Sequence, residues 1–165
     1  LARGGDAAEH DALGMPYCEV GERIAALTEQ IAVARAMLGG DPSQGITLAA
    51  ADYTGISANN SLVFTAGADG ARVERLKFTP MGTNVATVAR IYINNGSVNT
   101  TATNNTLIGE MTLPATTASA VAALISPEFV LSGGALALPP TFRIYVGLGT
   151  AVAAGWVVTP IAGQY

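Results

Sequence analysis

Between residues 20 and 40 the hydrophobic side chains recur at alternating steps of four and three residues, the heptad spacing of a coiled coil. The pattern predicts one amphipathic helix over 20–40, and the sequence Gly39-Gly40-Asp41-Pro42 ends it. The apolar stripe is narrower than that of a helix covering a globular core. We therefore expect it to join copies of the chain, as a trimer, with packing on its own domain as the alternative. The residues of this expected oligomer interface are Val20, Ile24, Leu27, Ile31, Ala34 and Leu38.

From residue 54 onward the helical period gives way to the alternation that is typical of β-strands. Seven or eight such segments follow one another without a helical pattern between them. The sequence predicts a mainly β fold, an antiparallel β-sandwich that is jelly-roll-like, although an immunoglobulin-like strand order stays open. The expected organisation is an N-terminal polar arm (1–19), the heptad helix (20–40), a linker (41–53) and the β-sandwich domain (54–165).

The phase of the alternation predicts which side chains share a face of each strand. Val73 is out of phase with Leu76 and Phe78, so we expect a β-bulge near Glu74–Arg75. The segment Ala115–Ile125 fits either a strand or a short helix. The residues expected to share a face within their strands are Leu62 and Phe64; Val85, Thr87, Ala89, Ile91 and Ile93; Leu107, Gly109, Met111 and Leu113; and Phe142, Ile144, Val146 and Leu148.

Composition narrows the classes of function. Half of the 165 residues are hydrophobic and only 12% are charged, about half the usual charged fraction, so we expect partners to cover part of the surface. The net charge of −4 argues against a nucleic-acid binder that neutralises phosphates. Residues 144–165 carry no charge, but glycines and a proline interrupt the run and its apolar residues alternate. We therefore expect buried strands there and no membrane partner.

The side chains that usually perform catalysis are scarce. The single cysteine, Cys18, cannot form an internal disulfide, and the single histidine, His10, cannot build a histidine metal site. An acidic neighbour, Glu19, raises the pKa expected for the Cys18 thiol and disfavours a nucleophile. Gly147-Leu-Gly149 begins like a dinucleotide-binding loop but lacks the third glycine and the helix. The sequence therefore predicts no enzyme, no cofactor and no metal site.

Four basic residues stand out in the β region, which is otherwise weakly charged. Arg72, Arg75, Lys77 and Arg90 fall on two segments that we expect to be adjacent strands. They fit a solvated strand face with cross-strand ion pairs, or alternatively a contact surface for an acidic partner.

Two neighbouring segments carry a resemblance to a known family. Residues 64–76 read FTAGADGARVERL, and residues 82–96 read GTNVATVARIYINNG. Together with Ala154-Gly155-Trp156 and the final Gly163-Gln164-Tyr165, they resemble small structural proteins encoded among the virion genes of tailed bacteriophages. The likeness covers most of residues 60–165 and none of the heptad helix, and the insertion rich in Thr and Asn at 99–105 departs from it.

The resemblance implies a virion component on the capsid exterior, such as a head decoration (cement) protein that oligomerises on the major capsid protein and reinforces the head. A capsid-bound oligomer hides apolar surface in its interfaces, which agrees with the low charge of the chain. The alternative is a phage fibre module that recognises a host glycan or surface protein. Exposed rings of Tyr92, Tyr145 or Trp156 would favour that function, because sugars stack on aromatic faces.

Overall fold

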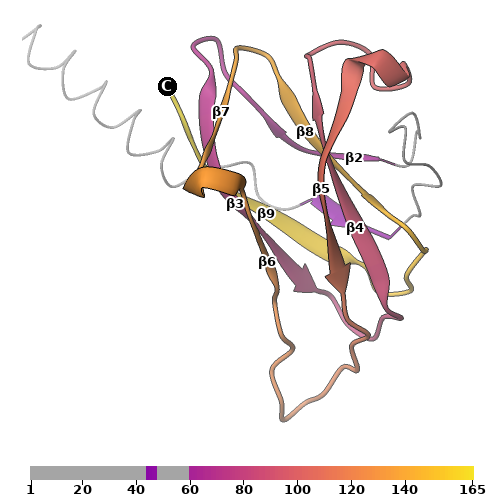
Figure 1. The fold of residues 1–165 in the computed structure, drawn as a ribbon. Helices are drawn as coiled ribbons and strands as arrows, with labels where there is room; N and C mark the ends of the chain where they lie inside the picture. The colour runs from indigo at the N-terminus through magenta and orange to yellow at the C-terminus, as the bar shows by residue number, and fades with distance from the viewer. Residues whose placement is uncertain (1–43, 48–59) are drawn as a thin grey trace, which may run out of the picture. The chain divides into compact units, whose positions relative to one another are not determined.

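The computed structural model describes residues 44–47 and 60–165 (Figure 1). The expected arm 1–19, the heptad helix 20–40 with its six interface residues, and Cys18 and His10 lie outside the described residues. The described residues form nine strands and two 3-10 helices. These are β1 (Gln44–Ile46), β2 (Ser61–Thr65), β3 (Ala71–Pro80), β4 (Thr87–Asn94), η1 (Ala102–Asn104), β5 (Asn105–Leu113), β6 (Glu128–Val130), η2 (Ser132–Gly134), β7 (Leu136–Leu138), β8 (Arg143–Leu148) and β9 (Trp156–Gln164).

The strands pair into two antiparallel sheets, as the alternating pattern predicts. The first sheet has the order β1-β9-β3-β6, and β7 also pairs with β3, beyond β6 along the same edge. The second sheet has the order β2-β8-β4-β5. β1 lies within the stretch 41–53 that was expected to be a linker. The sequence did not predict this strand, because three residues are too few to show an alternating pattern.

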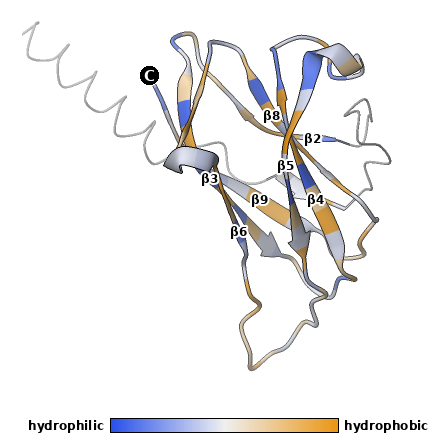
Figure 2. Ribbon diagram, viewed as in Figure 1, coloured by the Kyte–Doolittle hydropathy of each residue, from blue (hydrophilic) through white to orange (hydrophobic). Residues whose placement is uncertain are grey.

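One hydrophobic core joins side chains from both sheets. Figure 2 shows hydrophobic and hydrophilic positions interleaved along the strands, so each strand presents an apolar row to this core. The bulge expected near Glu74–Arg75 is confirmed, since the register between β3 and β9 shifts between Val73 and Arg75. The shift lets Val73 and Leu76 both reach the core.

Three expectations about phase are wrong. Val85 precedes β4 and is exposed. In β2 the register shifts between Leu62 and Phe64, and Val63 is buried in place of Leu62. In β5 Ile108 packs against the core where Leu107 was expected, because the pairing with β4 skips Ile108. A bulge beside two successive apolar residues leaves no mark in the alternation.

The segment Ala115–Ile125 forms neither a strand nor a helix. It belongs to the loop 114–127, which joins β5 to β6 and extends well beyond both sheets (Figure 1). Its only pairing among the described residues is an isolated bridge between Thr116 and Asn84. The alanines and small polar residues of this loop bury too little apolar surface to hold a regular element.

Candidate functional site

The basic residues expected to form one cluster belong to two different sheets. Arg72, Arg75 and Lys77 lie on β3, and Arg90 lies on β4, which has no pairing with β3. The expectation that they lie on adjacent strands is therefore wrong. Arg75 forms an exposed ion pair of 3.4 Å with Glu128 on β6. The pair Arg72–Glu74 is longer, at 3.8 Å, and is also exposed.

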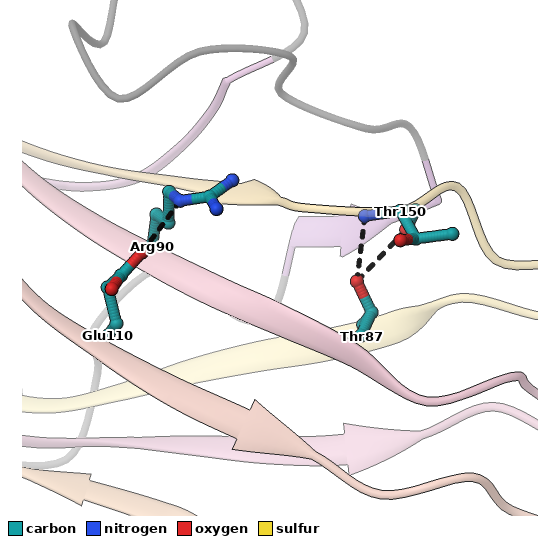
Figure 3. A network of polar contacts seen from close by, with 4 residues as sticks. All are labelled: Thr87, Arg90, Glu110 and Thr150. Carbon is teal, nitrogen blue, oxygen red and sulfur yellow. Dashed lines mark hydrogen bonds and ion pairs between the residues drawn. The ribbon is translucent and has the colours of Figure 1, made fainter.

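Arg90 has a structural environment different from that of the other three. Its side chain is only 11% exposed, and its Nε donates a 2.7 Å hydrogen bond to Glu110 Oε1, directly opposite on β5 (Figure 3). The guanidinium lies against Gly149, where an added β-carbon would be 3.3 Å from Arg90 Nη1. Arg90 therefore joins strands β4 and β5, and little of it is available to a partner.

The most distinctive surface of the described residues is formed by three loops at one end of the domain. These loops are 81–86, 114–127 and 149–155, and we call them together the uncharged end. They contain no Asp, Glu, Lys, Arg or His. They expose several large apolar side chains, with exposed fractions of 97% for Val121 and 76% for Ile125, and Met81 and Val85 are also more than half exposed.

Asn84 joins the three loops to one another. It is buried, with 4% of its surface exposed. Its Oδ1 accepts 2.9 Å hydrogen bonds from the N–H groups of both Ala154 and Gly155, and its Nδ2 donates to Gly155 O at 3.0 Å. Its backbone N–H donates to Thr116 O at 3.0 Å, and Thr116 N–H donates back to Asn84 O at 2.9 Å. One residue thus holds three loops together: its side chain bonds the loop before β9, and its backbone bonds the loop after β5.

Threonine hydroxyls add further bonds at the same end. Thr116 Oγ1 donates to Gly82 O at 2.6 Å, and Thr83 Oγ1 accepts from Ala118 N–H at 3.0 Å. At the base of loop 149–155, Thr87 Oγ1 accepts from Thr150 N–H at 2.9 Å and donates to Thr150 O at 3.1 Å (Figure 3). Because these bonds cross between loops, they fix the loop positions without help from charged groups.

The rings expected to favour sugar recognition are mostly in the interior. Trp156 is fully buried and belongs to the core. Tyr92 is 1% exposed, and Tyr145 is half-buried. A stacking platform for sugars therefore has little aromatic surface available from these three residues.

Within residues 44–47 and 60–165, His, Cys, Asp and Glu side chains do not gather in threes as a metal site would require. None of the described helical segments has the length and apolar character that a membrane crossing needs.

Comparisons of the chain with protein-family models, with curated proteins and with solved structures give no match.

Asn84 and the uncharged end were missed by the sequence reasoning. The absence of charge from three separate loops is visible in the sequence, but their common location depends on strand order, which the sequence does not specify. Asn84 stands in a chain rich in asparagine, and nothing local distinguishes it from the others.

Proposed function

We propose that this chain is a non-enzymatic structural component of a tailed-phage virion, a capsid decoration protein that binds the exterior of the head through its uncharged end. The observation that carries the proposal is the exposed apolar surface around Val121 and Ile125 on three loops that hydrogen bonds hold in place. Patches of this kind on a stable domain are typical of protein–protein contacts. The resemblance of segments 64–76 and 82–96 to virion proteins supports the same function.

We propose further that the two sheets form a β-sandwich of the jelly-roll type. Taken as two halves of one strand, β6 and β7 reduce the nine strands to eight, with sheet orders 1-8-3-6 and 2-7-4-5. Eight strands in two such sheets describe a jelly roll, a fold frequent among viral capsid proteins and lectins. This supports a virion function only by analogy of fold.

The chemistry of the uncharged end favours attachment to a protein shell. Burying uncharged, apolar side chains in an interface carries little desolvation cost, whereas each buried charge would need a partner of opposite charge. Loops already held in place lose less entropy when they bind. We therefore expect attachment to depend weakly on ionic strength, unlike attachment through the basic residues of β3.

Oligomerisation is proposed to come from the heptad helix, outside the described residues. A trimer would place three uncharged ends on the shell, and several weak attachments joined in one oligomer bind more tightly than one. Removal of residues 1–40 is therefore expected to weaken attachment, even though it leaves the uncharged end intact.

The alternative proposal, a fibre module that recognises a host glycan, has less support. Exposed rings would favour it, but Trp156 and Tyr92 are buried. If the purified protein binds glycans on an array and does not bind heads, the result would favour the fibre module.

The test uses phage heads assembled without this protein and measures how much added protein sediments with them. Val121→Asp places a charge on the uncharged end and is expected to reduce binding at least about tenfold, because the charge would be buried without a partner. Val98→Asp is the matched control, since Val98 is 61% exposed in the β4–β5 loop, at the opposite end of β4. The wild type and the Val98 variant should bind alike at low and high salt. If Val121→Asp binds like the wild type and only removal of residues 1–40 abolishes binding, attachment is through the N-terminal region and the uncharged end is not the docking surface.

A further inference from the structure

Two buried asparagines lie near the two ends of strand β4: Asn84 precedes the strand and Asn94 is its last residue. Their hydrogen bonds join different parts of the chain. Asn94, at the end of β4, is fully buried. Its Nδ2 donates to Asn105 Oδ1 at 2.8 Å, and its Oδ1 accepts from Gly96 N–H at 2.9 Å. These bonds stay within the β4–β5 connection. The bonds of Asn84, in contrast, join three loops that are distant in the sequence.

We infer that Asn84 is the positioning residue of the uncharged end: its side chain holds loop 149–155 and its backbone holds loop 114–127 in the arrangement that binds the partner. The inference rests on the proposed function and names the residue on which that docking surface depends.

The geometry supports this role because apolar side chains form no hydrogen bonds of their own. The positions of Val121 and Ile125 therefore depend on the hydrogen bonds that hold their loop. Ile125 and Val121 are located on a loop of fourteen residues. Near its start this loop is held by the paired backbone bonds of Thr116 with Asn84, and two residues later by Ala118 N–H on Thr83 Oγ1. Loop 149–155 is held near its end by the two N–H groups that Asn84 Oδ1 accepts. Loss of the Asn84 side chain would therefore remove three of the hydrogen bonds that join loop 149–155 to loop 81–86, and would leave the backbone bond from Met81 N–H to Gly155 O at 3.0 Å.

A variant that lacks the Asn84 side chain is expected to bind heads with lower affinity, while the number of binding sites on each head stays the same. If the loops of a variant occupy the docking arrangement for about a tenth of the time, the apparent dissociation constant rises about tenfold while the number of copies bound at saturation stays the same. A residue that only stabilised the fold would change neither quantity under conditions where the protein remains folded.

The experiment compares Asn84→Ala with Asn94→Ala in binding to heads assembled without the protein, at a temperature where both variants are folded by circular dichroism. Both are expected to lose stability, but only Asn84→Ala should bind more weakly, with unchanged saturation. Amide exchange should become faster at Ala154 and Gly155 in Asn84→Ala and stay unchanged there in Asn94→Ala.

If Asn84→Ala does not fold, a less disruptive variant can be tested in its place. Thr116→Val removes the hydroxyl that donates to Gly82 O and accepts from Asn84 N–H at 3.2 Å, while it keeps the backbone pair. It should weaken binding a few-fold in the same way. Equal affinity of the wild type and the Asn84 and Thr116 variants, with Val121→Asp defective, would overturn the positioning role and leave the proposed function standing. Failure of the wild type to bind heads would instead overturn the proposed function, on which this inference rests.

Discussion

Gly109 and Phe129 make a contact that spans the two sheets, and it leads to a sharp prediction about stability. Gly109 lies on β5, at the edge of the second sheet, and Phe129 lies on β6, at the edge of the first. A β-carbon added to Gly109 would overlap the ring of Phe129, with ring atom Cε2 2.8 Å away. The ring therefore covers the glycine and closes this side of the core, and Gly109→Ala forces the ring to move.

The expected cost follows from the geometry. Overpacking a well-filled contact by a methyl group costs about 1–3 kcal/mol, and the half-buried ring of Phe129 can shift partly toward solvent, so we expect about 1–2 kcal/mol. Phe129→Leu alone removes ring contacts and costs about 1 kcal/mol. In the Phe129→Leu background the added methyl group has room, so Gly109→Ala should cost roughly nothing there. The coupling energy between the two substitutions is then about 1–2 kcal/mol.

Urea unfolding followed by tryptophan fluorescence measures these differences, because the only tryptophan, Trp156, is fully buried. The slope of the free energy of unfolding against urea should stay the same for all variants, since the exposed surface is unchanged. Gly163→Ala is the matched control, because a β-carbon there meets no atom within 4 Å. The reasoning is refuted if Gly109→Ala is no more destabilising than Gly163→Ala, or if its cost is the same with and without the Phe129 ring.

Three further predictions concern other parts of the molecule. Arg90→Met should lower the free energy of unfolding by about 1–3 kcal/mol because it removes a nearly buried charged hydrogen bond, whereas the exposed pair of Arg75 should contribute about 0–1 kcal/mol in Arg75→Met; equal effects in urea titrations would contradict this. A short tag after Tyr165 should stay accessible to an antibody on decorated heads, because β9 runs away from loop 149–155 toward the opposite end of the domain. The double variant Ile24→Asp with Ile31→Asp should dissociate an oligomer while the tryptophan signal of the folded β domain is retained; an unchanged mass in solution would show that the heptad is not the interface.

The sequence predicted the mainly β character of the fold, its antiparallel sheets and several details of the strands, since each of these depends on local alternation. The bulge at Glu74–Arg75 was detectable because Val73 and Leu76 are separated by charged residues, which makes the change of phase visible. The bulge at Ile108 was not detectable, because Leu107 and Ile108 are both apolar and fit either phase.

The candidate site could not be derived in the same way, because it depends on which strands are neighbours. Arg75 and Arg90 are close in the sequence, yet their strands belong to different sheets. Conversely, Asn84 and Gly155 are 71 residues apart and share a buried hydrogen bond. Pairings of this kind are specified by the packing of the whole domain, and a pattern read over ten residues does not contain them.

The measurement that tests the central claim most directly is the absolute mass of the purified protein by light scattering, first alone and then mixed with heads assembled without it. The proposed decoration function predicts an oligomer, expected to be a trimer, that adds mass to the heads up to a fixed saturation. A monomer that adds no mass to the heads at any concentration would contradict the account.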